Sequence, residues 1–296
     1  MRFISVKESA KLWGLSERSV RNYCAQGRVE GAFLTGKTWN IPENARKPAR
    51  SNSAESVPTT LAEILEDEMK SGRKGGIYHK VQVELTYNSN HMEGSRLTAE
   101  QTRYIFETNT IGVLKDETVN VDDIIETTNH FRCIDTIISC CNKKLSEAFI
   151  KQLHGILKSN TSDSRKSWFS VGDYKMQPNE IGGEETILPK NVHSEMRKLL
   201  SEYENGEPKT LDDIVEFHAR FEKIHPFQDG NGRVGRLIMF KECLRFGVVP
   251  FIIDASIKLL YYNGLKRWNE QHGYLIETCK LAQDAFGEML EYFEIK

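Results

Sequence analysis

The sequence has no apolar run approaching 18 residues, and its start, MRFISVKESAKLWGLSE, becomes charged after four residues. We therefore expect neither a membrane span nor a secretory signal. Cysteine is sparse, since the six cysteines form no CxxC pair and no regular framework, which favours reduced thiols in a cytosolic protein. An excess of one charge is also missing, because 40 Lys and Arg nearly balance 42 Asp and Glu. With 39% hydrophobic residues, this composition excludes wholesale disorder and a fibrous chain.

Charge is nevertheless distributed unevenly along the chain. Residues 1–50 contain ten Lys and Arg against four Glu, so the N-terminal part is basic. Residues 48–60, PARSNSAESVPTT, are rich in Ser, Ala and Pro and have no apolar periodicity, which is typical of a solvated linker. The sequence therefore predicts a small domain over residues 1–47, a linker over 48–60 and a larger domain over 61–296.

The basic N-terminal part has the pattern of a small DNA-binding domain. Two short helices are predicted, and Ser16 can cap the second, on which Arg18, Arg21 and Asn22 share one face as in a recognition helix. The following segment AFLTGKTWNIP alternates about a tight turn and predicts a hairpin. Residues 1–47 resemble the winged helix-turn-helix of the MerR and excisionase type, which implies duplex DNA as a partner. The alternative is a protein-contact module whose surface charge is incidental.

The larger domain is expected to be mainly α-helical. Its one exception is residues 168–190, where paired glycines and short apolar runs predict a hairpin or flap within the helical domain. Apolar periodicity predicts, after a helix that starts at residue 61, further helices around residues 77–90, 99–108, 122–141, 146–158, 191–204, 210–224, 232–246, 254–270 and 274–293.

Residues 211–247 combine a helix exit, a tight loop and a new helix. Proline pushes the residue before it out of the α region, so His225, which precedes Pro226, lies where the first helix ends. Asp229-Gly230 and Asn231-Gly232 are successive turn dipeptides, and a strongly apolar helix begins after them. The loop thus ends on a helix N-terminus, whose free N–H groups and dipole favour a phosphate.

The charged side chains of this segment suit phosphate chemistry. Arg233 and Arg236 lie in the first turn of the second helix, where cations are unfavourable unless an external anion compensates them. Asp229 offers an oxygen ligand for Mg²⁺ beside a polyphosphate, and His225 offers a base near neutral pH. Together they indicate phosphoryl or nucleotidyl transfer. Residues 230–235 also fit GxGxxG, but a helix precedes them where the dinucleotide fingerprint needs a strand, and the valine and lysine strand of protein kinases is missing.

The run HPFQDGNGRVGR, residues 225–236, matches every fixed position of HxFx(D/E)GNGRxxR, the signature of the Fic family. Residues 61–296 therefore resemble a Fic domain. In this family the histidine that matches His225 deprotonates a Ser, Thr or Tyr hydroxyl of a target protein, which attacks the α-phosphate of ATP and receives AMP. The resemblance implies that Asp229 holds Mg²⁺ and that the phosphates are held by the loop residues Gly230, Asn231, Gly232, Arg233 and Arg236.

A second short match lies upstream of the signature. Residues 89–94, SNHMEG, fit the family's inhibitory pattern (S/T)xxxE(G/N). In related proteins the glutamate of this helix pairs with the second arginine of the signature and blocks the seat of the ATP γ-phosphate. The resemblance therefore implies that Glu93 pairs with Arg236 and restrains activity. The alternative is the end of a surface helix with no regulatory role.

Two further segments resemble parts of the family. The flap would lie between about Lys175 and Pro189 and pair edge-on with the target segment. Residues 259–268, LLYYNGLKRW, resemble the stretch that closes over adenine, which makes Tyr261, Tyr262 and Asn263 candidates. For each of these residues, packing in a helical core is an equally weighted alternative. The other histidines, His218 included, are interpreted as packing residues, because no third metal ligand is evident.

The sequence as a whole predicts a cytosolic, ATP- and Mg²⁺-dependent protein adenylyltransferase with an N-terminal DNA-binding domain. One alternative is a Fic enzyme that removes AMP or transfers another phosphate-containing group. The other is a transcriptional regulator that uses the Fic domain as a nucleotide sensor. The sequence does not specify the target protein, the DNA operator or the oligomeric state, and a homo-oligomer is one possible state.

Overall fold

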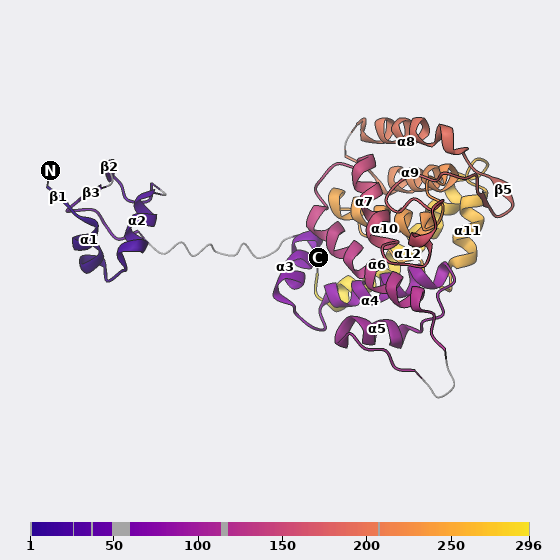
Figure 1. Ribbon diagram of the computed structural model, residues 1–296, viewed down its shortest axis with the longest axis horizontal. Coiled ribbons are helices and arrows are strands. Elements are labelled where there is room, and N and C mark those ends of the chain that lie inside the picture. Colours follow the sequence, from indigo (N-terminus) through magenta and orange to yellow (C-terminus); the bar gives the residue numbers. More distant parts are fainter. Residues whose placement is uncertain are drawn as a thin grey trace. The chain divides into compact units, whose positions relative to one another are not determined.

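The computed structural model describes residues 2–25, 27–36, 38–48, 60–113, 118–206 and 208–295. The chain divides into two compact units, Met1–Val57 and Pro58–Lys296 (Figure 1). The linker predicted over residues 48–60 lies almost entirely outside the described ranges. Within those ranges, no helix is long and apolar enough to cross a membrane.

The N-terminal unit contains two helices and a small antiparallel sheet with the strand order β1-β3-β2. The helices are α1 (Val6–Trp13) and α2 (Glu17–Ala25), and the strands are β1 (Phe3–Ile4), β2 (Phe33–Thr35) and β3 (Thr38–Pro42). The predicted hairpin is present, with Thr35 of β2 opposite Thr38 of β3. Val20 of α2 and Ile41 of β3 are fully buried in one apolar cluster, which holds the helix pair on the sheet.

The C-terminal unit is helical apart from one small hairpin. Its first helices are α3 (Leu61–Ser71), α4 (Ile77–Met92), α5 (Ala99–Thr108), α6 (Val121–Cys140) and α7 (Glu147–Leu157). A 3-10 turn, η1 (Asp163–Arg165), and the hairpin strands β4 (Glu180–Ile181) and β5 (Glu184–Glu185) follow. The chain ends with α8 (Pro189–Glu204), α9 (Leu211–Ile224), α10 (Asn231–Phe246), α11 (Lys258–Lys266) and α12 (His272–Tyr292).

The predicted helices and the predicted hairpin are therefore confirmed, with one difference. The helix expected over residues 254–270 is shorter, because the Asp254 carboxylate accepts hydrogen bonds from the backbone N–H groups of Ser256 and Ile257 at 2.8 and 3.3 Å. These bonds hold a turn in place, since an aspartate that binds nearby backbone groups offers an alternative to the helix. Helix α11 consequently begins only at Lys258.

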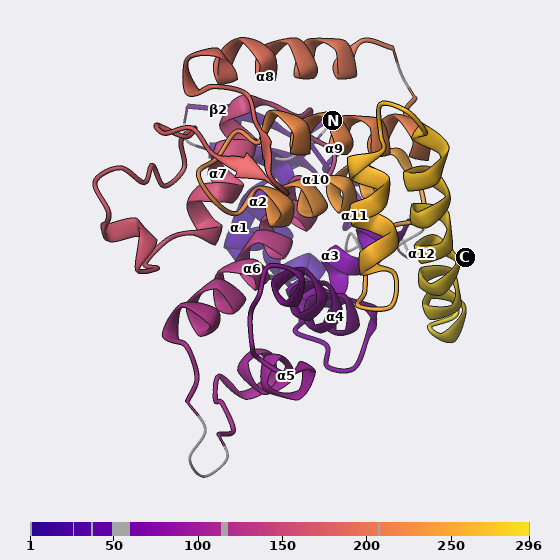
Figure 2. The same ribbon diagram turned by 90° about the vertical axis from the view of Figure 1, so that its right-hand side faces the viewer.

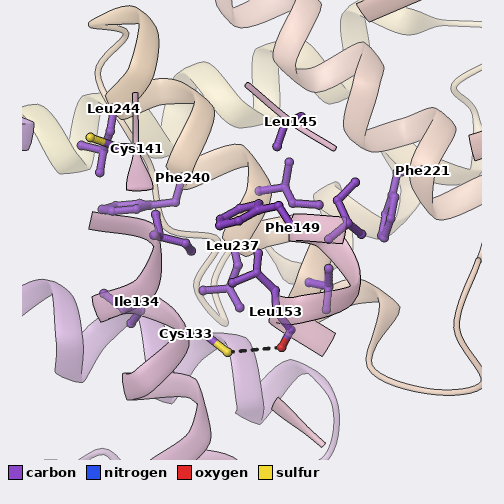
Figure 3. Close-up of a cluster of buried hydrophobic side chains, with 14 of the residues drawn as sticks. Cys133, Ile134, Cys141, Leu145, Phe149, Leu153, Phe221, Leu237, Phe240 and Leu244 are labelled. Atoms are coloured by element: carbon purple, nitrogen blue, oxygen red, sulfur yellow. Dashed lines mark hydrogen bonds between the residues drawn. The ribbon is translucent and has the colours of Figure 1, made fainter. Parts of the chain in front are cut away.

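Helix α10 forms the centre of this unit. It packs against α9, α6, α4 and α7. In the view of Figure 2 it lies below α8, which is at the top, and above α5, which is at the bottom. Thirteen of its sixteen residues are buried, as expected of a helix that contacts other helices all round. In Figure 3, Leu237 and Phe240 of α10 lie close to Phe149 and Leu153 of α7. This packing fixes the N-terminus of α10, where the signature loop ends.

The six cysteines are free thiols, and five of them are buried. Cys133 lies in the main apolar cluster, where its thiol contacts the backbone carbonyl of Leu153 at 3.5 Å (Figure 3). This contact joins α6 to α7 beneath the signature loop.

Candidate active site

His225 ends helix α9 in a left-handed conformation, with φ of 51°. Pro226 disfavours the right-handed helical conformation for His225, and the left-handed turn directs the chain out of the helix and into the loop. The imidazole Nδ1 lies 3.3 Å from the Glu222 carbonyl and donates to it, which leaves Nε2 as the acceptor nitrogen. Burial, together with the positive charge of Lys175, lowers the pKa of His225 to about 4 against the opposing effect of the Glu222 carbonyl. The ring is therefore neutral at pH 7 and can accept a proton.

The loop after His225 is held in shape by buried side chains. The ring of Phe227 is fully buried and stacks on His154, with ring centroids 4.0 Å apart. The Asn231 side chain binds both backbone groups of Phe227: its Oδ1 accepts from the N–H at 2.8 Å, and its Nδ2 donates to the carbonyl at 2.9 Å. Asn231, which the resemblance places among the phosphate-binding residues, thus uses its side chain to shape the loop in this conformation. Its amide faces inward and closes the loop.

No described side chain caps the N-terminus of α10. Gly230 precedes the helix with φ of 81° and offers no side chain to bind the first backbone N–H groups, which no helical carbonyl can pair. A Cβ atom at Gly232 would lie only 2.4 Å from Oε1 of Glu93. The carboxylate of Glu93 therefore occupies the space directly beside the helix N-terminus, where the dipole favours negative charge.

Glu93 and Arg236 form the ion pair that the sequence predicts. Nη2 of Arg236 lies 2.7 Å from Oε1 of Glu93, and the arginine is only 4% exposed. Ser89 completes the set, because its hydroxyl accepts from Nε of Arg236 at 3.0 Å and its carbonyl from Nη2 at 2.9 Å. Burial opposes ionisation of Glu93, but Arg236 and Arg233 outweigh it and keep its pKa below the ordinary value. Helix α4 and the signature helix are thus joined through a charged contact.

Asp229 belongs to a charge network that the sequence did not indicate. Its Oδ2 lies 2.7 Å from Nζ of Lys158 and 3.3 Å from Nη2 of Arg233. Lys158 is 2% exposed and also binds Glu126 and Asp163. Burial opposes ionisation of Asp229, but the two cations hold its pKa far below the usual range. These partners come from α6, from η1 and from the residue after α7, so no local sequence pattern could have revealed them.

Arg233 differs from the expectation that it is free to hold outer phosphates. It is 3% exposed and binds Glu126 as well as Asp229. Its Nε has no hydrogen-bond partner among the described residues. In this conformation Arg233 therefore fixes Asp229 and α6 on the loop, and a phosphate would have to reach the guanidinium past these carboxylates.

The flap lies against the signature loop. The backbone N–H of Lys175 donates to the Pro226 carbonyl at 2.9 Å, and Nδ2 of Asn179 donates to the Phe227 carbonyl at 2.9 Å. The backbone N–H of Gln177 donates to the side chain of Gln228 at 3.2 Å. Three contacts therefore connect the first arm of the hairpin to three consecutive loop residues.

The three candidate adenine-binding residues differ in their exposure to solvent. Tyr261 is fully buried, and its hydroxyl lies 2.6 Å from Nε2 of His218, so in this structure it packs in the helical core. Tyr262 is 38% exposed, and its hydroxyl lies 3.4 Å from the carbonyl of Met92, next to Glu93. Asn263 is exposed on the same helix, α11. Only Tyr262 and Asn263 are therefore accessible to a ligand.

Among the described residues, side chains that could bind a metal do not form a site made of protein ligands alone. Within the described ranges, no group of three or more His, Cys, Asp or Glu could hold an ion. His218 is fully enclosed, and burial lowers its pKa to about 3, so it is a neutral packing residue bonded to Tyr261.

The three candidate DNA-contacting side chains of the N-terminal unit lie on α2. Arg18, Arg21 and Asn22 all face solvent. Arg21 also forms a surface ion pair with Glu17 at 2.7 Å. Such an exposed pair contributes little to stability, so it leaves Arg21 available to another anion.

Comparisons with known proteins identify the class of the helical unit. Residues 144–243, which include the whole signature loop, match the family described as Fic/DOC. This part of the chain is therefore similar to a Fic domain, and further helices precede and follow it in the sequence.

Curated relatives agree with this classification. The chain is 27% identical over 193 residues to a "Protein adenylyltransferase Fic" of Drosophila mojavensis and 25% identical over 191 residues to one of Nematostella vectensis. These matches cover 62% and 63% of this chain but only 36% and 43% of the relatives. The chain thus spans less than half the length of the curated relatives that it matches.

Solved structures share the fold. A Fic domain containing signaling protein from Bacteroides thetaiotaomicron superposes with a TM-score of 0.58 at 24% identity, covering 77% of this chain and 97% of that one. Fic-1 (residues 134–508) from C. elegans superposes with a TM-score of 0.59 at 18% identity, covering 78% and 69%. Their similarity supports the helical Fic fold of the C-terminal unit.

Proposed function

We propose that this protein is an adenylyltransferase that transfers AMP from ATP to a Ser, Thr or Tyr hydroxyl of a target protein, and that Glu93 restrains this reaction. One observation carries the proposal. A neutral, half-buried His225 stands at the start of a loop that leads to the uncapped N-terminus of α10, and the Glu93 carboxylate lies beside that N-terminus, where an anion would bind. The Fic domain and the adenylyltransferase relatives support the same reaction.

His225 supplies the base. Its Nε2 takes the proton of the target hydroxyl while the hydroxyl oxygen forms a bond to the α-phosphorus of ATP. The bond between that phosphorus and the bridging oxygen breaks, and pyrophosphate leaves with the electron pair. The Glu222 carbonyl holds the ring in the tautomer that leaves Nε2 free. Catalysis of this kind depends mainly on positioning and on charge stabilisation.

Asp229 suits a magnesium ion that is shared with ATP. Its contacts to Lys158 and Arg233 use Oδ2, so Oδ1 can face a ligand, and its lowered pKa keeps the carboxylate ionised. Mg²⁺ is commonly bound by one or two carboxylates together with substrate phosphates, which agrees with a site that lacks a full set of protein ligands. When bound, the ion would neutralise charge on the phosphates.

Incubation of the purified chain with α-labelled ATP and Mg²⁺ tests this function. We expect labelled protein from the Glu93→Gly variant, and a loss of roughly 100- to 10,000-fold when His225→Ala is added, because a positioned base contributes about that much. ATP binding and the melting temperature should change little. His193→Ala, on helix α8, is the matched control and should label normally. Unchanged transfer by the His225→Ala variant would contradict the mechanism.

A second function, binding of duplex DNA, is supported by the N-terminal unit. Three exposed side chains that can contact DNA lie together on α2, beside a hairpin, in a basic part of the chain. Helices of this kind enter the major groove while basic residues contact phosphates. We propose that Arg18, Arg21 and Asn22 form this contact. A protein-contact module is the alternative outcome of the DNA-binding assay described below.

A further inference from the structure

Lys175 is a buried cation in the arm that leads into the flap. It is 3% exposed, and its Nζ donates to Oδ1 of Asn179 and to the hydroxyl of Thr186, both at 2.6 Å. Both acceptors are neutral, and among the described residues no carboxylate forms an ion pair with this ammonium group. Burial consequently lowers the pKa of Lys175 to about 8. An unpaired buried charge is unfavourable for stability, so it requires another explanation.

The hydrogen bonds of Lys175 connect both arms of the flap. Asn179 lies just before β4 and Thr186 just after β5, and the Thr186 hydroxyl donates to the Asn179 carbonyl at 2.9 Å. The ammonium group therefore closes the base of the hairpin. Nδ2 of the same Asn179 side chain donates to the Phe227 carbonyl, and the backbone N–H of Lys175 donates to the Pro226 carbonyl. The hairpin is thus fixed relative to the two residues that follow His225.

The charge of Lys175 also acts on His225. Besides burial, four groups affect the pKa of this ring, namely the Glu222 carbonyl, Lys175, Glu93 and Asp229, and the Glu222 carboxyl group also lies 3.9 Å from its Nδ1. Of these, Lys175 alone disfavours the imidazolium, whereas the other three favour it. Lys175 lies on the flap arm, and the three favouring groups lie on α9, at the C-cap of α4 and in the signature loop.

We infer that Lys175 is a positioning residue with two separate effects: its hydrogen bonds align the flap, and hence the target hydroxyl, with His225, and its ammonium group places a positive charge on the flap arm that is bonded to the residue after His225. The alignment effect rests on the proposed adenylyl transfer, because it concerns a target segment paired with the flap edge. The charge effect concerns this chain alone. A misalignment of about 1 Å at a reacting centre can reduce a rate by about 100-fold.

Three variants separate the two effects. Lys175→Met removes both the charge and the hydrogen bonds. Asn179→Ala keeps the charge but removes the link to Phe227. Lys190→Met changes an exposed lysine on α8 and serves as the matched control.

Two measurements are made on the full chain. The pKa of His225 is followed by NMR of ¹⁵N-labelled histidine, with its signal identified by loss in the His225→Ala variant. Self-labelling with α-labelled ATP is measured in the Glu93→Gly background, together with the Kd for Mg²⁺-ATP.

We expect Lys175→Met to raise the pKa of His225 above about 4 and to slow labelling at least about tenfold, with the Kd for ATP within about twofold. Asn179→Ala should slow labelling without changing the pKa, and Lys190→Met should change neither. Lys175→Gln, which keeps a hydrogen-bond donor but no charge, should also raise the pKa and serves if the Met variant does not fold.

An unchanged His225 pKa in folded Lys175→Met or Lys175→Gln would overturn the charge effect. Normal labelling by Asn179→Ala and Lys175→Met would overturn the alignment effect. If the Glu93→Gly chain itself transfers no label, the proposed function fails, and the titration of His225 still decides the role of the Lys175 charge.

Discussion

Replacement of Glu93 by glycine should activate the protein, because one carboxylate competes with ATP for two groups. Its Oε1 lies 2.7 Å from Nη2 of Arg236 and within 2.4 Å of the place where a Cβ atom of Gly232 would stand. A phosphate that binds the N-terminus of α10 must therefore displace Glu93. Because the glutamate is part of the same chain, its effective concentration is high, and the resting state is restrained.

The size of the gain follows from the contact that is lost. A hydrogen bond to a charged group contributes about 1.5–3 kcal/mol, and each 1.4 kcal/mol corresponds to about a tenfold change. At ATP concentrations below saturation, Glu93→Gly should therefore label about 10- to 150-fold faster than wild type. Glu93→Gln keeps the shape of the side chain without its charge and should give an intermediate rate.

The same substitution should reduce stability in the absence of nucleotide. It leaves the buried Arg236 without its carboxylate, and removal of one partner of a buried pair costs about 3–5 kcal/mol. Ser89 continues to bind the guanidinium, so we expect the lower part of this range. Mg²⁺-ATP should restore much of the lost melting temperature, because a ligand that binds only the folded state stabilises it.

The assay compares initial rates of labelling by α-labelled ATP at several ATP concentrations. Glu84→Gln is the matched control, since Glu84 lies on the same helix, α4, and pairs with Lys80 at the surface. It should label at the wild-type rate. Arg236→Ala should not reproduce the gain, because it removes the phosphate ligand together with the partner of Glu93. Equal rates for wild type and Glu93→Gly at saturating Mg²⁺-ATP and below it would refute the reasoning.

Two further predictions concern DNA binding and packing. The full chain should bind duplex DNA with an affinity that falls as salt rises, and Arg18→Ala and Arg21→Ala should each lower the log–log slope by about 1 if they contact phosphates, whereas no binding even at low salt would identify a protein-contact module. Gly235→Ala should lower the free energy of unfolding by about 1–3 kcal/mol, since the new Cβ would lie 2.7 Å from the buried side chains of Glu222 and His218. Gly287→Ala on α12, where nothing lies within 4 Å, should lose no stability in the same denaturation measurement.

Local sequence signals were sufficient for the secondary structure and for the signature loop. At the starts of α1 and α3, Ser5 with Glu8 and Thr60 with Glu63 form capping boxes, whose members lie only three positions apart in the sequence. Pro226 and Gly230 likewise determine where α9 ends and α10 begins, through their own backbone preferences. Helix ends and tight loops depend on residues that are close together in the sequence, so the sequence alone was sufficient to predict them.

The Glu93–Arg236 pair lies at the limit of what the sequence could predict. The two residues are 143 positions apart, and only the family pattern joined them. Sequence reasoning alone placed Glu93 at the end of a helix and Arg236 in the first turn of another. The ion pair was predictable from the resemblance, but its partners in Ser89 and its position over Gly232 were not.

The remaining features depended on how the helices pack. Tyr261 and Tyr262 are adjacent tyrosines, yet Tyr261 is fully buried against His218 and Tyr262 is 38% exposed. Successive residues on a helix point about 100° apart. Which of the two side chains faces the core therefore depends on where the neighbouring helices pack. Lys158 and Lys175 look like ordinary lysines in the sequence. Tertiary structure buries the first among carboxylates from three segments and the second among neutral groups of the flap, and it thereby assigns them different physical roles.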